Sequence, residues 1–412
     1  FGKVLATETK AKGRHVILAP CVNIARIPMG GRNFESFGED PFLTSRITVN
    51  YIKGVQNENV VATVKHFAAN NQEHQRDFVN TTVDERTLNE IYFPAFKSAV
   101  EEAKVLAVMC AYNKLNGSYC SENDYLLIDV LKNKWKFNGL VMSDWGAVHT
   151  SLPVFNSGLD LEMPDGKYLN TDSLLEKIKS GELSEAKLDD KVRRILRVMF
   201  TIGLFDDYKY DSTKVNTDEH KQIALNIAKE GIVLLKNENS ILPLDLNKIK
   251  SIAVVGPNSK VAVTGGGGSS MVVPFTSVSP LEALKNKIGD KVKINFAQGM
   301  IIDGETNPIE TKYLFTDKDE KVNGLKAEYF TNMNLEGEPV KVIVDNQINF
   351  MWNDKGPFED FQKDNFSVRW TGYVKAEKSA NFTFDVASDD GVRLYIDDQL
   401  AINDWNDHAM LT

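Results

Sequence analysis

One stretch of the sequence places an acid, an aromatic ring and a turn side by side. Asp144 follows the apolar run Leu140–Met142, and Trp145 and Gly146 come directly after it. An indole ring can stack on the apolar face of a pyranose, and a neighbouring carboxylate can attack or stabilise an oxocarbenium-like carbon. This pairing indicates chemistry on a sugar, with Asp144 as the candidate nucleophile.

Cationic side chains that could orient such a substrate lie upstream. Lys65, His66 and Arg32 can donate charge-assisted hydrogen bonds to hydroxyl groups, and fixed donors hold a sugar ring in one orientation. Each residue also has a purely structural alternative. His66 could be a buried histidine, and Lys65 or Arg32 could pair with Glu35 or Glu39. The sequence leaves these alternatives open.

Other functions fit single features only. Lys65 at a strand end would suit a Schiff-base aldolase, but nothing else points to a carbonyl or phosphorylated substrate. The spacing of His66 and His74 matches no helical pair of metal ligands, so we predict no metal site. A carbohydrate-binding or scaffold protein without turnover would leave the polar strand ends described below unexplained.

The elements that must position these side chains follow from alternating apolar runs and amphipathic stretches. The predicted strands are His15–Ala19, Val60–Val64, Val105–Cys110, Leu140–Met142 and Gly158–Leu161. The predicted helices are Phe42–Asn57, Thr87–Glu102, Asn123–Asn133, Thr171–Ser180 and Ser184–Gly203. Strands alternating with helices in this way predict βα units and a parallel sheet.

Polar side chains follow four of the predicted strands. In chain order they are Asn23 and Arg26, then Lys65 and His66, then Tyr112 and Asn113, and finally Asp144 and Trp145. A (β/α)₈-type barrel builds its active site from such strand ends. A full barrel takes about 250 residues, so we expect its first strand or two to lie upstream of Phe1.

The pattern changes near Leu204, and further domains are expected. Helix His220–Gly231, strand Ile232–Leu235 and strand Ser251–Val255 predict a smaller α/β sandwich domain. The loop Thr264–Ser270 carries four glycines but lacks a phosphate-loop motif, so we interpret it as a flexible loop over a neighbouring site.

Alternation with aromatic residues and turns from about Thr311 onward predicts an antiparallel β-sandwich. Its expected strands include Leu325–Phe330, Phe366–Tyr373, Asn381–Ala387 and Val392–Ile396. The predicted fold class is therefore α/β, with a barrel lacking its N-terminal part, an α/β sandwich domain and a β-sandwich inserted into it. The expected boundaries are 1–205 for the barrel, 206–216 for a linker, 217–310 for the α/β sandwich and 311–412 for the incomplete insertion.

Composition excludes some partners. The 412 residues carry a formal net charge of −9, which argues against a nucleic-acid partner. No apolar stretch approaches the length of a membrane span. Three cysteines show no zinc spacing, and Cys21 and Cys110 lie in apolar runs typical of buried thiols. A secreted or periplasmic location is favoured over a cytoplasmic one, and a homo-oligomer is left open.

Several segments of the chain resemble glycoside hydrolase family 3, in family order. They are LAPCVNIARIPMGGRNFESFGEDP (18–41), VKHFAANNQEHQR (64–76), MCAYNKLNG (109–117), VMSDWGA (141–147) and SGLDLEMP (157–164), followed by VLLKN (233–237) and LPL (242–244). The resemblance implies a retaining β-glycosidase, without cofactor or metal, in which Asp144 is the nucleophile. It implies that Arg32, Lys65, His66, Met109, Tyr112 and Trp145 line the sugar subsite.

The resemblance also indicates which class of sugar substrate to expect. Trp145 looks like the β-glucosidase branch, which acts on β-linked glucosides or oligosaccharides, whereas the xylosidase branch commonly has a smaller residue there. The stretch after Lys65 departs from the N-acetylglucosaminidase pattern. A β-xylosidase remains the alternative.

Two expectations concern the last part of the chain. LKAEYF (325–330) through SDDGVRLYIDD (388–398) resembles the protective-antigen-type β-sandwich, which some relatives insert near the pocket mouth. Related adhesins bind calcium where Asp389 and Asp390 stand, but a tight turn explains these residues equally well. The family's acid/base glutamate is expected beyond Thr412, and neither Glu305 nor Glu310 is assigned that role.

Overall fold

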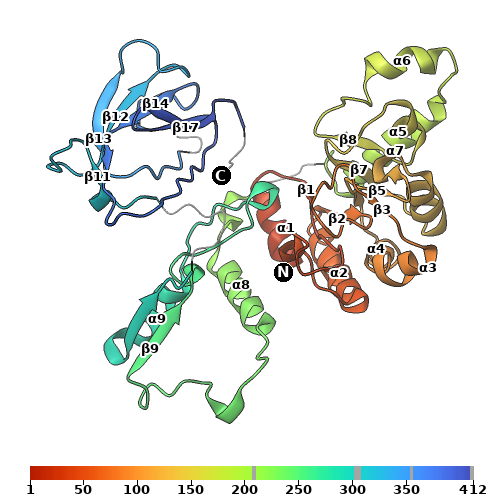
Figure 1. Ribbon diagram of the computed structural model, residues 1–412. Helices are drawn as coiled ribbons and strands as arrows, with labels where there is room; N and C mark the ends of the chain where they lie inside the picture. Colours follow the sequence, from red (N-terminus) through yellow and green to blue (C-terminus); the bar gives the residue numbers. More distant parts are fainter. Residues whose placement is uncertain (207–209, 301–307, 353–355, 409–412) are drawn as a thin grey trace. The chain divides into compact units, whose positions relative to one another are not determined.

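A curled, all-parallel sheet organises the first part of the chain in the computed structural model (Figure 1). Its five strands, in spatial order, are β1 (Val16–Ile17), β2 (Val61–Phe67), β4 (Ala107–Cys110), β7 (Leu140–Trp145) and β8 (Leu161–Met163). Their spatial order is also their chain order, and every pairing is parallel. The sheet is a half-barrel of βα units, which confirms the predicted fold class.

Helices cover the outer face of this sheet. They include α2 (Pro41–Gln56), α4 (Pro94–Glu101) and two π-helical segments, η2 (Leu88–Tyr92) and η4 (Tyr125–Lys134). Helix α2 begins where the sequence signals it: the Asp40 carboxylate accepts hydrogen bonds from the Phe42 and Leu43 amides at 2.7 and 2.9 Å, and Pro41 occupies the first turn. Helix α1 (Gly2–Ala11), which packs on α2, was not predicted.

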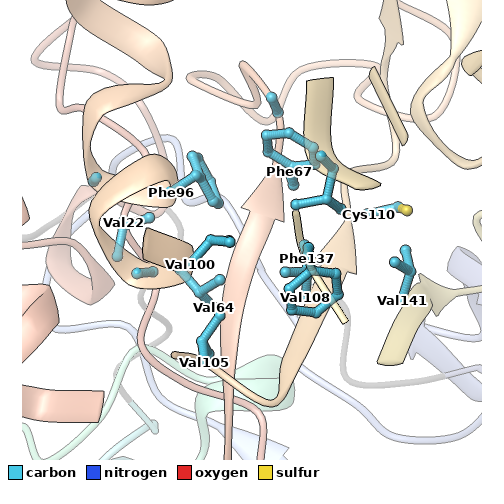
Figure 2. Packing of buried hydrophobic residues seen from close by; sticks show 14 of the residues in the cluster. Val22, Val64, Phe67, Phe96, Val100, Val105, Val108, Cys110, Phe137 and Val141 are labelled. Carbon is cyan, nitrogen blue, oxygen red and sulfur yellow. The ribbon is translucent and has the colours of Figure 1, made fainter. Parts of the chain in front are cut away.

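The main core lies between the sheet and these helices. Figure 2 shows Val64 and Phe67 of β2 and Val108 of β4 close to Phe96 and Val100 of α4. The opposite face of the sheet has its own cluster, in which Met109 and Met142 pack with Val198 near the end of helix α7 (Glu185–Thr201). Because side chains alternate along a strand, this second face is the one that ends in Lys65 and Asp144.

A small sheet follows the strand ends. It consists of β3 (Asn80–Thr81), β5 (Lys114–Leu115) and β6 (Ser118–Tyr119). The Asn116 side chain accepts from the Val83 amide and donates to the Val83 carbonyl, both at 2.9 Å. These bonds tie together the loops that follow β2 and β4, the loops that carry the site.

Contacts divide the chain into two units, which we describe separately. The structure describes residues 1–206, 210–300, 308–352 and 356–408. Unit 1 comprises Phe1–Pro243 and Thr264–Thr276, and unit 2 comprises Leu244–Val263 and Ser277–Thr412. Unit 1 thus holds the half-barrel, helix α6 (Thr171–Lys179), helix α8 (Asp218–Gly231) and the glycine-rich loop. The predicted division at 205, 217 and 311 stays a proposal.

Unit 2 contains a parallel pair and several antiparallel strands. Strands β9 (Ser251–Val255) and β10 (Lys293–Ala297) pair in parallel, with helix α9 (Pro280–Ile288) between them in sequence. The antiparallel strands are β11 (Leu314–Phe315) with β15 (Tyr373–Val374), β12 (Leu325–Phe330) between β13 (Lys341–Asp345) and β14 (Ser367–Thr371), and β16 (Val392–Ile396) with β17 (Gln399–Asp404). These sheets agree with the predicted β-sandwich.

Two strand predictions were wrong. Residues 232–235 and 381–387 are both described, and neither segment is part of a strand. The apolar run Ile232–Leu235 satisfies the sequence criterion for a buried strand, yet Leu235 is 92% exposed because no neighbouring strand pairs with it. Among the described residues, no helix is both long and apolar enough to cross a membrane.

Candidate active site

The candidate site lies at the C-terminal ends of three adjacent parallel strands. Lys65 and His66 are near the end of β2, Tyr112 follows β4, and Asp144 and Trp145 end β7. The register between β2 and β4 shifts after Val64, and that between β7 and β8 shifts after Met142. The strand ends are therefore irregular at the very point where the polar side chains emerge.

The two oxygens of the Asp144 carboxylate have different surroundings. Oδ1 accepts a hydrogen bond of 2.8 Å from the Trp145 backbone amide. Oδ2 is buried and accepts no hydrogen bond of standard geometry from any described residue. Burial raises the pKa of Asp144, while the Trp145 amide, the Tyr112 hydroxyl and the Lys65 charge oppose the rise. One carboxylate oxygen is fixed by a hydrogen bond and the other accepts none. This arrangement is expected of a carboxylate that attacks a carbon atom.

His66 is a titratable neighbour of that oxygen. Its Nε2 lies 3.4 Å from Asp144 Oδ2 and 3.1 Å from a terminal nitrogen of Arg32. Burial lowers the pKa of His66 well below its usual value, and the positive charges of Arg32 and Lys65 lower it further. The imidazole is therefore neutral, and its contact with Asp144 is not an ion pair.

Glu35 anchors the two cations beside His66. Its carboxylate accepts two hydrogen bonds from Arg32, at 2.8 and 3.1 Å, and lies 3.8 Å from Lys65 Nζ. Burial favours the neutral acid, but the bonds from Arg32 outweigh it and lower the pKa of Glu35. The salt-bridge alternative is thus correct for both cations. It does not remove them from the site, since Arg32 also contacts His66.

Tyr112 lies between an acidic side chain and a cationic one. Burial raises the pKa of Tyr112, and the charge of Asp144 adds to the rise. On its other side, the guanidinium of Arg76 lies 4.3 Å from the centre of the Tyr112 ring and donates a 2.7 Å hydrogen bond to Glu73. Sequence reasoning did not single out Arg76. Its position ten residues after His66 carries no periodic signal, and only the fold brings it to Tyr112.

The remaining two predicted residues differ in exposure. Trp145 is 41% exposed, so its ring is accessible beside the buried Asp144, which is 8% exposed. Met109 is fully buried and pairs in register with Met142, two residues before Asp144 on β7. Met109 therefore packs beneath the polar layer of the site, and its role in binding a sugar stays a prediction.

Family models match two parts of the chain. Residues 1–198 match the glycosyl hydrolase family 3 N terminal domain, and residues 321–411 match the PA14 domain. The chain belongs to glycosyl hydrolase family 3. The second match is consistent with the predicted protective-antigen-type sandwich within a family 3 chain.

Relatives of this family 3 chain are similar over most of its length. A thermostable beta-glucosidase B of Acetivibrio thermocellus is 46% identical over 304 residues, which cover 74% of this chain and 40% of that protein. Beta-glucosidase B of Emericella nidulans is 37% identical over 408 residues, 97% of this chain and 47% of that protein. The chain thus spans about half the length of the curated relatives it matches.

Solved structures agree with the family 3 assignment. The crystal structure of a beta-glucosidase from Kluyveromyces marxianus in complex with glucose has a TM-score of 0.73 at 33% identity, covering 98% of this chain and 49% of that one. Beta-glucosidase 3B from Thermotoga neapolitana in complex with glucose has a TM-score of 0.65 at 40% identity, covering 71% and 41%.

The remaining predictions for this family 3 chain concern other acidic residues and metal binding. Glu310 is largely exposed and pairs with Lys312 at 3.1 Å, whereas Glu305 and Thr412 lie outside the described residues. Asp390 accepts a 3.1 Å hydrogen bond from the His408 amide. Within the described ranges, no three His, Cys, Asp or Glu side chains are grouped as metal ligands would be, at Asp389 and Asp390 or elsewhere.

Proposed function

We propose that this family 3 chain acts as a retaining β-glucosidase with Asp144 as its nucleophile. The observation that carries the proposal is the free Oδ2 of a buried strand-end carboxylate, facing a cluster of Arg32, Lys65 and His66. The β-glucosidase relatives support glucose as the sugar. The proposed substrates are β-linked glucosides or oligosaccharides with a terminal non-reducing glucose.

The proposed reaction is a double displacement. Oδ2 of Asp144 attacks the anomeric carbon as the bond to the glycosidic oxygen breaks, and an acid protonates that oxygen. Water then attacks the same carbon and releases the carboxylate, so two inversions give net retention. Arg32 and Lys65 would donate to sugar hydroxyls, and the exposed Trp145 ring would stack on the pyranose.

Glu35 is unsuited to be the acid in this reaction. It is held as a carboxylate by Arg32 and Lys65, and its lowered pKa keeps the proton off at neutral pH. A general acid needs the opposite, a raised pKa. A test of Asp144 should therefore use a leaving group that departs without protonation.

The test is covalent trapping. The chain is incubated with a 2-deoxy-2-fluoro-β-glucoside bearing a dinitrophenyl leaving group, and its intact mass is measured. We expect one glycosyl adduct, mapped to Asp144 by peptide sequencing. Asp144→Asn should lower the labelling rate by about 10³-fold or more. Asp129→Asn, at an exposed carboxylate on η4, should label like the parent.

The outcomes separate the alternatives. No adduct on a chain whose circular dichroism shows it folded would reject the proposed function and favour a binding protein without turnover. An adduct formed faster with the corresponding fluoroxyloside would instead assign the β-xylosidase activity. Trapping by borohydride at Lys65 would indicate the Schiff-base alternative.

A further inference from the structure

The segment before α2 runs alongside the end of β2 and brings Asn23 to His66. Cys21 forms a parallel bridge with Lys65, and the Val22 amide donates a 2.8 Å hydrogen bond to the Lys65 carbonyl. Asn23 is the next residue and is 8% exposed. It was one of the polar residues expected to follow the first strand, and the proposed reaction does not use it.

Asn23 makes three hydrogen-bond contacts with His66. The Asn23 Nδ2 donates to the His66 carbonyl at 2.9 Å, and the His66 amide donates to the Asn23 Oδ1 at 3.0 Å. These two bonds fix which end of the Asn23 amide is oxygen, because an amide N–H needs an acceptor and a carbonyl needs a donor. The same Oδ1 lies 3.1 Å from the His66 ring nitrogen Nδ1.

This geometry determines where the proton of the imidazole lies. Oδ1 can only accept, so Nδ1 must carry the hydrogen of the contact. In a neutral ring, Nε2 is then an acceptor, which suits the donation from Arg32 at 3.1 Å. It also accounts for the absence of a hydrogen bond between Nε2 and Asp144 Oδ2 at 3.4 Å.

We propose that Asn23 is a positioning residue that holds His66 as the neutral Nδ1–H tautomer, with Nε2 as the acceptor of the Arg32 hydrogen bond and not a donor to Asp144. This inference rests on the proposed function, because it explains how the attacking oxygen of Asp144 stays free. It has a chemical consequence for Asp144. A protonated Nε2 would donate to Oδ2 and occupy the attacking oxygen, whereas the acceptor form leaves that oxygen free.

Four charged groups besides Asn23 bear on the charge of His66, and one of them, the Asp144 carboxylate 3.4 Å from Nε2, favours a second proton on the ring. Arg32, Lys65 and Arg76 oppose a second proton on the ring. Cys21 Sγ lies 3.7 Å from Nδ1 and 3.4 Å from the Ser36 hydroxyl, and it is a thiol with a raised pKa. No charge near Nδ1 therefore competes with Asn23 for the ring proton.

The first measurement needs no substrate. Nitrogen-15 spectra of the histidine-labelled full chain would report the tautomer of His66, with His66→Gln used to assign its signals. We expect a protonated Nδ1 and a bare Nε2 that do not change between about pH 5 and 8. A bare Nδ1, or an imidazolium in this range, would overturn the proposal in the parent protein itself.

Asn23→Asp tests the positioning role. The new carboxylate beside Nδ1 would stabilise an imidazolium, so His66 should titrate within this pH range. The labelling rate of Asp144 should then fall at low pH, by about tenfold for each unit below the new pKa of His66. An unchanged pH profile in a folded Asn23→Asp protein, with His66 still untitrated, would contradict the positioning role.

The matched control is Asn123→Asp. Asn123 is also 8% exposed and also bonds two backbone groups, the Leu115 carbonyl and the Leu126 amide, both at 3.0 Å. Among the described residues its side chain forms no hydrogen bond with a histidine, so this variant should leave both the His66 spectrum and the pH profile unchanged. If the parent forms no glycosyl adduct, the proposed function fails, and the spectra still decide whether Asn23 fixes the tautomer.

Discussion

Glu35 connects the two cations of the site at the scale of single residues. Charge-assisted pairs of this kind are short and directional, and this one is partly shielded from water. Arg32 and Lys65 come from segments more than thirty residues apart, and both form ion pairs with this one carboxylate. Its proposed role is to keep two long, flexible side chains in place before a substrate binds.

Glu35→Gln should weaken sugar binding without unfolding the chain. The amide keeps the shape but removes the charge that both cations face, so we expect glucose to bind about tenfold more weakly. The measurement is the glucose concentration that protects Asp144 from labelling. Glu39→Gln, at an exposed carboxylate four residues away, is the control and should change nothing. Equal protection in the parent and Glu35→Gln would show that the cations need no anchor.

The sequence predicted the members of the site better than their partners. Asp144, Lys65, His66 and Tyr112 follow apolar runs, and a run that ends in a polar group is a local pattern. The pairing of Lys65 with Glu35 and the contact of Arg76 with Tyr112 depend on how distant segments approach each other. No spacing rule decides such contacts: the sequence left the pairing of Lys65 with Glu35 open as one alternative, and the contact of Arg76 with Tyr112 became apparent only in the fold.

At the scale of elements, a buried lysine of helix α7 forms hydrogen bonds with the segment that precedes strand β8. Lys191 donates to the carbonyl of Ser157 at 3.2 Å and to that of Leu159. Beside it, Lys132 and Asp160 form a buried pair at 2.7 Å. Burial lowers the pKa of Lys191 to about 8. The folded state therefore resists charging Lys191, and this cost changes with pH.

The contribution of Lys191 to the free energy of unfolding of unit 1 should rise with pH between about 8 and 10. Below pH 8 Lys191 is protonated in both states, but above it the unfolded chain binds more protons, which favours folding as pH rises. The gain over this window should be about 2 kcal/mol. The three buried thiols oppose this contribution above about pH 9, because burial raises the pKa of Cys21, Cys110 and Cys120 and the unfolded thiols ionise first.

Lys191→Met should lose this contribution, so its free energy of unfolding should fall relative to that of the parent between about pH 8 and 10. Unfolding of unit 1 can be followed by pulse labelling of thiols in urea, because all three cysteines are buried in that unit. Lys179→Met, at an exposed lysine of α6, should keep the parental slope. Parallel pH profiles for Lys191→Met and the parent would show that Lys191 does not produce the effect.

Element prediction succeeded where burial and length agreed. Strands β2, β4 and β7 are short apolar runs covered on both faces, and helix α2 has its cap and first-turn proline in the sequence. It failed at residues 232–235, since an apolar run says nothing about whether a partner strand is present. Strand β13 was also missed, because half of its side chains face water and its pattern is weak.

At the scale of the whole molecule, the two units have separate stabilising centres. In unit 2 the buried carboxylate of Asp345 accepts hydrogen bonds from the Tyr329 hydroxyl at 2.7 Å and the Trp370 indole at 2.8 Å. These bonds join β12, β13 and β14 through one oxygen of Asp345. The sheet formed by these three strands belongs to unit 2. Each unit should therefore respond to its own substitutions.

Asp345→Ala should destabilise unit 2 alone. Two buried donors would lose their acceptor, which we expect to cost about 2–4 kcal/mol. Tryptophan fluorescence in urea should show an earlier transition, since Trp352, Trp370 and Trp405 lie in this unit. Thiol labelling of unit 1 and trapping at Asp144 should be unchanged, and the exposed Asp319→Ala should alter neither. Earlier thiol labelling in Asp345→Ala would show that the units unfold together.

The bond from Trp145 to Asp144 has a consequence for how this site can vary through evolution. The donor is the peptide N–H of Trp145, so any residue but proline at that position would still hold Oδ1. The indole ring is a separate, exposed contribution of the same residue. Selection could therefore change the side chain that the proposed sugar substrate would meet, while the backbone support of the proposed nucleophile stays the same. A change of substrate at this position would require no second, compensating mutation.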